Sequence, residues 1–212
     1  MYMALVDKVT PKVIARLYNN GDLDKASLAA LRNAADFTSP QATIIWPLIF
    51  SSVPEEEKNQ DNELNDENNL NKFFGKNGQI SYSEQAIFIA LKMYALYQRG
   101  IDERNVYEKK DGKDRLTFFQ ALNRVRQGKS DDEKKPLDRR VNNLFRSTST
   151  EPIFNSLIQL QKLLKSENDT LSIDYVQLAR DIYSLQFDYE SMRRVVLKWG
   201  QEYFYNNVKN KN

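Results

Sequence analysis

Apolar residues recur at helical spacing along most of this chain, and no segment alternates strictly between apolar and polar positions as a half-buried strand does. The pattern is clearest in the last third of the sequence, where three separate apolar stripes follow one another. They consist of Ile153, Leu157, Leu160 and Leu164, then Leu178, Ile182 and Leu185, and finally Met192, Val195, Val196, Trp199 and Tyr203. The pattern predicts an all-α fold.

Helix boundaries in the first fifty residues are suggested by proline and glycine. Thr10 followed by Pro11 has the character of an N-cap and a first-turn proline, so we expect a short first helix that ends at Gly21. Within the apolar run 44–50, Pro47 predicts a kink or a break, because proline removes a backbone donor and clashes with the preceding turn.

Further along the chain, the same signals indicate three more boundaries. Ser81 and Glu84 have the spacing of a capping box, which predicts a helix from there to Gly100. A short helix carrying several basic residues is expected to stop near Gly128, and Pro136 is expected to open the next one. The aromatic residues of these helices have core spacing, which favours packing over base stacking.

Composition divides the chain into two parts. Residues 54–71 are rich in Asn, Asp and Glu with almost nothing to bury, which is typical of disordered segments. We therefore predict two small helical bundles, an N-terminal one at 1–105 with a mobile acidic loop at 54–79, and a C-terminal one at 106–212.

The chain has no histidine and no cysteine. Their absence excludes disulfides, thiolate nucleophiles and Cys-based metal sites, together with the commonest metal ligand and general base. No P-loop, dinucleotide-binding or nucleophile-elbow motif occurs either. With no apolar stretch of ~20 residues and no apolar signal segment, we expect a cytoplasmic protein without a cofactor that is not an enzyme.

Charge is unevenly distributed, although the net charge is only +2. Residues 51–71 are acidic, whereas basic residues outnumber acidic ones in 92–146. Basic side chains on neighbouring short helices could converge on one face and bind backbone phosphates without reading base sequence. On or beside those helices lie Arg115, Arg124, Arg126, Lys129, Arg139, Arg140 and Arg146, and the loop before them contains Lys109, Lys110 and Lys113.

Two other interpretations of the charged residues remain open. The cations could be ordinary solvated helix faces with local ion pairs, in which case the protein would be a helical interaction scaffold. Alternatively, Asp131 and Asp132 could ligate magnesium in a metal-dependent phosphodiesterase, but they sit in what reads as a polar loop rich in lysine and arginine. We rank the phosphodiesterase far behind.

Several segments, in order, resemble the CasB family, the small subunit of the type I-E CRISPR complex Cascade. Residues 137–146 (LDRRVNNLFR) are similar to the family's arginine-pair helix, and 157–164 (LIQLQKLL) to its leucine-rich helix. The C-terminal segments 172–182 (SIDYVQLARDI) and 198–204 (KWGQEYF) resemble its C-terminal signature. Near the start, 29–35 (AALRNAA) is similar to the family's opening. The acidic insert has no counterpart.

The resemblance implies a non-catalytic, two-bundle helical protein that is present as a pair of copies beside the backbone and large subunits of Cascade. It implies binding of crRNA and target DNA by their backbones, which would stabilise the R-loop and the displaced strand. Arg139, Arg140 and Arg146 are the first candidates for this contact, aided by Arg115, Arg124, Arg126 and Lys129, with Arg32 and Lys162 as lesser candidates.

Overall fold

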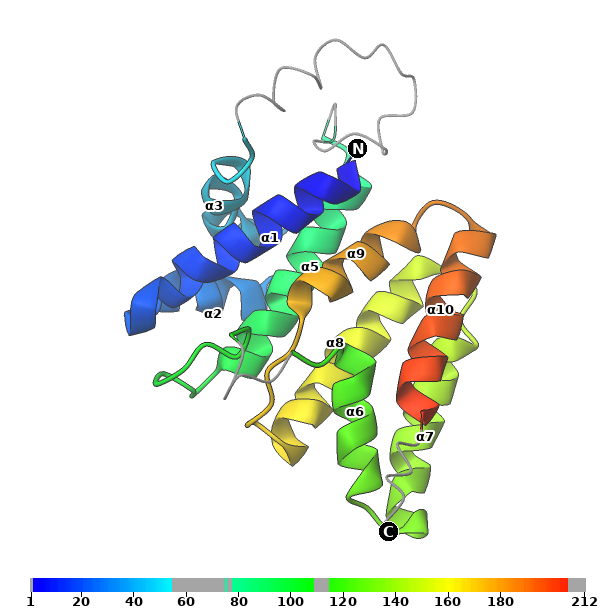
Figure 1. Ribbon diagram of the computed structural model, residues 1–212. Helices are drawn as coiled ribbons and strands as arrows, with labels where there is room; N and C mark the ends of the chain where they lie inside the picture. Colours follow the sequence, from blue (N-terminus) through cyan, green and yellow to red (C-terminus); the bar gives the residue numbers. More distant parts are fainter. Residues whose placement is uncertain (1, 55–74, 76–77, 109–114, 206–212) are drawn as a thin grey trace.

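The computed structural model describes residues 2–54, 75, 78–108 and 115–205, and it consists of α-helices joined by turns and short 3₁₀ segments (Figure 1). The described residues contain no β-strand, only an isolated bridge between Leu116 and Ile173. The predicted all-α class is confirmed. The helices are α1 (Tyr2–Tyr18), α2 (Lys25–Asn33), α3 (Trp46–Phe50), α5 (Tyr82–Gln98), α6 (Phe118–Gln127), α7 (Asp131–Phe145), α8 (Thr150–Glu167), α9 (Tyr175–Ser184) and α10 (Tyr189–Phe204).

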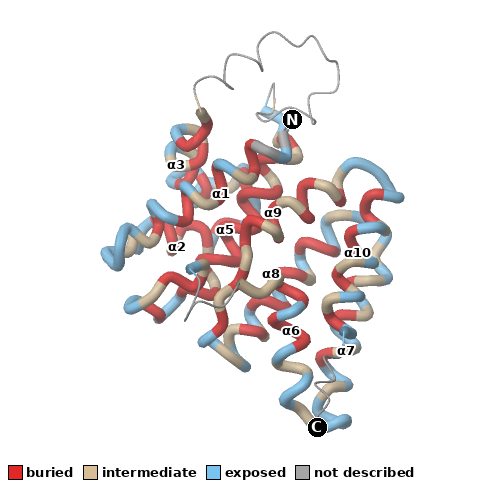
Figure 2. Tube along the Cα trace, viewed as in Figure 1, coloured by how far each residue is buried: buried red, intermediate tan, exposed pale blue. Residues whose placement is uncertain are grey.

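Helix α5 is the central element of the fold. Nearly all of its residues are buried, around its whole circumference, because α1, α2, α8 and α9 all pack against it (Figures 1 and 2). A helix that is apolar all round belongs inside a core. Its start is fixed by the predicted capping box, in which Ser81 Oγ accepts from Glu84 N at 3.1 Å and Glu84 Oε2 accepts from Ser81 N at 2.8 Å.

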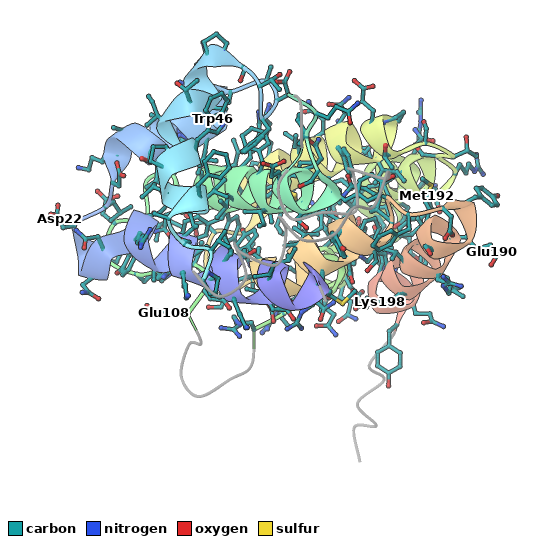
Figure 3. All side chains as sticks on the ribbon, turned by 90° about the horizontal axis from the view of Figure 1, so that it is seen from above. Asp22, Trp46, Glu108, Glu190, Met192 and Lys198 are labelled. Atoms are coloured by element: carbon teal, nitrogen blue, oxygen red, sulfur yellow. The ribbon has the colours of Figure 1, made fainter. Side chains whose placement is uncertain are left out.

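The other side of the molecule is formed by α6, α7 and α10, with α8 and α9 between it and α5 (Figure 1). The three predicted apolar stripes of the last third are buried on α8, α9 and α10, with Leu185 directly after α9. In the view from above, Lys198 lies where α9 and α10 meet (Figure 3). Helix α6 ends at its C-cap Gly128, and the 3₁₀ segment Pro40–Ile44 is separated from α3 just before Pro47, both as predicted.

The first helix differs from the prediction. It begins at Tyr2, and Pro11 lies inside it where we expected the first turn. Leu5 and Val9 continue the stripe of Val13 towards the N-terminus, and all three are buried in the core. Packing of this longer face against α5 and α9 outweighs the backbone hydrogen bond that the proline removes.

Helix α7 also starts earlier than predicted. Ser130 is its N-cap, and Pro136 lies within the helix and does not open it. Ser130 N donates to Glu133 Oε2 at 2.9 Å, so the capping box sets the start. Asp131 and Asp132 therefore belong to a first helical turn, where carboxylates complement the helix dipole, and were wrongly assigned to a loop.

Residues 55–74 and 76–77 lie outside the described residues, and with them most of the loop predicted at 54–79. Within the described part of the chain, one cluster of buried apolar residues continues across the predicted boundary between 105 and 106. Buried Val106 lies at that boundary and accepts a hydrogen bond from Ile173 N at 3.0 Å. The division into two bundles stays a prediction. No helix that the structure describes is long and apolar enough to cross a membrane.

Candidate nucleic-acid interface

Arg126 is held by groups of its own chain. Its Nε and Nη2 donate to the two carboxylate oxygens of Asp138 at 2.7 and 3.2 Å, and the Tyr203 hydroxyl donates to the same carboxylate at 2.6 Å. The hydrogen bond that Arg126 donates to Asp138 raises the pKa of Arg126, although partial burial acts to lower it. A bidentate pair of this kind joins α6 to α7 and leaves little of the guanidinium for a ligand.

Two further candidates are also compensated within the chain. Lys129 pairs with Glu167 at 2.7 Å, which links the end of α6 to the end of α8. Arg115 lies 3.7 Å from a carboxylate oxygen of Asp174 and stacks over the ring of Tyr107 at 4.2 Å. Both side chains therefore contribute to packing between segments. Lys109, Lys110 and Lys113 lie outside the described residues.

Arg139, Arg140 and Arg146 form an uncompensated set, which we call the α7 arginine stripe. All three are exposed, and none of their side chains makes a hydrogen bond or ion pair with another described residue. Arg139, Asn143 and Arg146 follow one another at i, i+4 and i+7, so they share one line along the helix. The opposite face is the buried one, with Leu137, Val141 and Leu144.

Arg140 of the stripe also lines a groove between α7 and α8, whose exposed lining is more apolar than polar. This groove has a volume of about 270 Å³. Its amide and hydroxyl groups add neutral hydrogen-bond donors beside a permanent positive charge, which is the combination that phosphate oxygens accept. The lining residues are Arg140, Asn143, Asn155, Ser156, Gln159 and Leu160.

Arg124 is exposed but lies elsewhere. It lines a separate groove of about 730 Å³ between α6 and the end of α10, together with Gln120, Gln201 and Tyr205. The predicted basic residues of α6 and α7 therefore do not share one groove. Arg126 on α6 pairs with Asp138 on α7, whereas Arg124 and Arg140 line grooves on different helix pairs.

The two lesser candidates lie near a third location, where α2 and α8 pack on α5. Arg32 on α2 is half-buried, and its Nη1 lies 3.5 Å from the carbonyl of Ala95 on α5. Lys162 on α8 is exposed. Sequence reasoning did not single out two further cations of this region, Lys92 on α5 and Arg99, the C-cap residue directly after α5. Only their i, i+7 spacing on one helix was visible in the sequence.

Comparison with known families identifies the chain. The family described as "CRISPR-associated protein Cse2" matches residues 27–204, which include every candidate residue named above. The chain belongs to the Cse2 family. Cse2 proteins, also called CasB, are subunits of CRISPR Cascade complexes, and this chain is one of them.

A solved structure supports the fold assignment. The crystal structure of CasB from Thermobifida fusca superposes with a TM-score of 0.61 over 96% of this chain and 97% of that one. At 19% identity the two Cse2-family sequences have diverged widely, so the likeness shows a shared fold and no individual contact. No curated protein is similar enough to this chain to count as a match.

Gln161 and Lys162 are neighbours on α8, within the segment 157–164 that resembles the family's leucine-rich helix. Gln161 is fully buried, and its Oε1 lies 3.4 Å from the Tyr175 hydroxyl, so it belongs to the core of this Cse2 chain. Lys162, the next residue along α8, is exposed. At this pair of positions only Lys162 can reach a ligand.

Proposed function

We propose that this chain is the non-catalytic small subunit of a type I-E Cascade complex and that it holds nucleic-acid backbone. By doing so it stabilises the R-loop between crRNA and target DNA, together with the displaced strand. The observation that carries this proposal is the α7 arginine stripe. It presents three exposed cations without a carboxylate partner among the described residues, whereas Arg126, Lys129 and Arg115 lie beside carboxylates.

The physical basis is the affinity of fixed cations for phosphate. Each phosphate neutralised by a side chain releases condensed counterions, which gives binding that depends on salt and ignores base sequence. In RNA-guided effectors the exchange of duplex for heteroduplex is close to balanced, so a few backbone contacts shift its equilibrium. A rigid helix that carries three arginines is sufficient for that role.

The partners in this proposal are the backbone and large subunits of Cascade, a second copy of this chain, crRNA and target DNA. Cse2-family membership supports the presence of other Cascade subunits. The proposal assigns the chain no cofactor and no reaction, and it places the protein in the cytoplasm.

Replacing Arg139 and Arg140 with alanine is expected to weaken R-loop formation by reconstituted Cascade about tenfold at 0.15 M salt. The slope of log affinity against log salt is expected to fall by about 1.8, because each lost duplex phosphate contact contributes about 0.9. Both side chains are exposed and unpaired in the described structure, so the melting temperature is expected to stay within about 2 °C of wild type.

The matched control removes two other exposed cations that have no partner among the described residues, Lys12 on α1 and Lys25 on α2. This double variant, K12A/K25A, changes net charge by the same amount. Equal R-loop stability in both double variants would show that the α7 stripe makes no specific contact and would count against this site.

A second candidate function is a helical protein-interaction scaffold without nucleic-acid contact. It is favoured by large apolar side chains that are exposed around α10, of which Tyr189, Leu197 and Tyr205 are each more than 60% exposed. This role predicts that assembly of the chain into Cascade does not depend on salt concentration. It also predicts that Leu197→Ser weakens this assembly, whereas R139A/R140A leaves R-loop stability unchanged.

A further inference from the structure

Aromatic rings and carboxylates act together on several cations of this protein. Arg115 lies over the ring of Tyr107, 4.2 Å from its centroid, and its Nε is 3.7 Å from Asp174 Oδ2. A ring face and a carboxylate both attract a cation, so the combination holds it more firmly than either group alone. The same combination recurs for Arg126 with Tyr203 and Asp138, and for Lys165 with Tyr97 and Asp169.

A pocket between α1 and residues 105–108 is lined by the same kinds of group. It has a volume of about 170 Å³, and its lining includes two tyrosines, Tyr18 and Tyr107, and the carboxylate of Glu108. Glu108 lies beside α1 in the view from above (Figure 3). None of the lining residues carries a positive charge. The rest of the lining is neutral and consists of Pro11, Ile14, Ala15, Asn20 and Asn105.

Hydrogen bonds fix the segment that presents Glu108. Asn105 is 5% exposed, its Oδ1 accepts from Tyr107 N at 3.0 Å, and its Nδ2 lies 3.5 Å from Glu108 Oε1. Glu108 N donates to the carbonyl of Asn105 at 3.1 Å, which closes a turn. Val106 N donates to Gln98 Oε1 at 3.0 Å and so ties the segment to α5. A carboxylate that is fixed in advance loses little conformational entropy when a ligand binds.

The charge of Glu108 is not balanced within the described part of the chain. Glu108 is exposed, and its side chain makes no ion pair with another described residue. Arg115, which contacts Tyr107, already has Asp174 as its carboxylate partner. A negative charge beside two aromatic rings favours a positively charged ligand and repels phosphate.

The chemistry of the pocket suits a guanidinium group better than an ammonium group. A guanidinium is planar and weakly hydrated, and it can stack on a tyrosine ring while its edge donates to a carboxylate. Arg115 on Tyr107 shows this arrangement in the same molecule. A pocket of this volume accommodates the end of one side chain, and arginine is enriched where proteins meet.

We propose that the pocket lined by Tyr18, Tyr107 and Glu108, here the α1–Glu108 pocket, binds the guanidinium group of an arginine side chain from another protein subunit of Cascade. Glu108 accepts hydrogen bonds from the guanidinium, and the tyrosine rings contact its face. The inference goes beyond the proposed function, because the α7 arginine stripe is directed at phosphate. The existence of other subunits follows from Cse2-family membership and not from the R-loop proposal.

The first test measures binding of N-acetyl-arginine amide to the full chain from backbone amide shifts in NMR spectra. We expect a dissociation constant on the order of millimolar, with the largest shifts at Tyr107 and Glu108. N-acetyl-lysine amide is expected to bind roughly threefold more weakly. N-acetyl-citrulline amide, which has nearly the same shape without the charge, is expected not to bind. Equal binding of the citrulline compound would overturn the proposal.

Two substitutions test the lining residues with the same probe. Glu108→Gln is expected to weaken binding of N-acetyl-arginine amide about fivefold, and Tyr18→Leu about threefold. The matched control is Glu151→Gln, which removes an exposed carboxylate on α8 outside the pocket and is expected to have no effect. Glu108 has no ion pair in the described structure, so the melting temperature of E108Q is expected to stay within about 2 °C of wild type. Equal affinities of E108Q and E151Q would overturn the proposal.

The second test asks whether the arginine belongs to another subunit. Cascade reconstituted without this chain is titrated with wild type, E108Q or E151Q. E108Q is expected to bind the rest of the complex about fivefold more weakly than the other two. If E108Q weakens binding of N-acetyl-arginine amide but assembles like wild type, the pocket serves a small cationic molecule and the partner assignment is wrong. The effect of R139A/R140A on R-loops is measured separately, so either proposal can fail alone.

Lysines of the chain itself are the remaining candidates for this pocket. Lys109, Lys110 and Lys113 follow Glu108 in the sequence and lie outside the described residues. The triple variant K109A/K110A/K113A is expected to bind N-acetyl-arginine amide with wild-type affinity. An affinity about fivefold higher than that of wild type would show that one of these lysines occupies the pocket, and would overturn the proposal.

Discussion

Replacing Trp199 with alanine is expected to destabilise the protein by about 4 kcal/mol, the largest effect we predict for a single substitution. The indole is 1% exposed and stacks on Phe119 with ring centroids 4.8 Å apart, which joins α10 to α6. Its Nε1 donates to Asp181 Oδ2 at 2.8 Å and so also joins α10 to α9. Alanine removes the packing and the hydrogen bond together. Urea unfolding followed by circular dichroism measures the loss.

Trp199→Phe is the control that separates these contributions. It keeps an aromatic ring against Phe119 but removes the indole N–H and part of the buried ring volume, so we expect a cost of about 1–2 kcal/mol. Asp181 retains Lys198 as a partner in this variant. If the free energy of unfolding of the alanine variant lies within about 1 kcal/mol of the wild-type value, Trp199 does not hold the central position between α6, α9 and α10 that we assign to it.

Asp138→Asn is the second large effect, with an expected loss of about 2 kcal/mol at pH 6 to 7. Removing one member of a fully buried pair costs about 3–5 kcal/mol, and partial exposure reduces that value. The side chains of Arg126 and Asp138 are 19% and 24% exposed. Asparagine keeps the shape and one oxygen acceptor but leaves the Arg126 charge without its carboxylate.

The pH dependence of this loss follows from the pKa of Asp138. Burial on its own raises that pKa, but hydrogen bonds from Arg126 and Tyr203, together with the charge of Arg126, outweigh burial and hold it below the ordinary value. A carboxyl with a lowered folded pKa stabilises the fold above its unfolded pKa, and this contribution disappears as the pH falls through the folded pKa. The difference between wild type and D138N is therefore expected to shrink below about pH 4.

Denaturant unfolding of both proteins between pH 7 and pH 2.5 tests this expectation. A difference that stays constant across this range would show that Asp138 does not carry a charge that Arg126 stabilises. Arg126→Ala, D138N and the double variant R126A/D138N form a double-mutant cycle with wild type, and a coupling energy near zero would lead to the same conclusion.

Helix positions were predictable from the sequence wherever a stripe and a cap agreed. Ser81 with Glu84 marked the start of α5, and the stripe ending at Tyr203 marked α10. The prediction was wrong where proline was taken as a helix start. Pro11 and Pro136 both lie inside helices, because burial of the longer apolar face in α1 and the capping box at Ser130 in α7 override the local signal.

The candidate site was only partly predictable, because the identity of a cation's partner is a tertiary property. Arg126 and Arg139 look alike in the sequence, each on a short basic helix. The fold places Asp138 against Arg126 and leaves Arg139 exposed without a carboxylate among the described residues.

The sequence by itself determined the all-α class, because helical periodicity and caps are local properties of the chain, and its lack of histidine and cysteine excluded sites built on those two residues. It also carried the resemblance to the family to which the chain belongs. Only the tertiary structure decided which cations are compensated and which face solvent. That outcome depends on distances between helices far apart in sequence, such as the 3.5 Å between Arg32 and the carbonyl of Ala95.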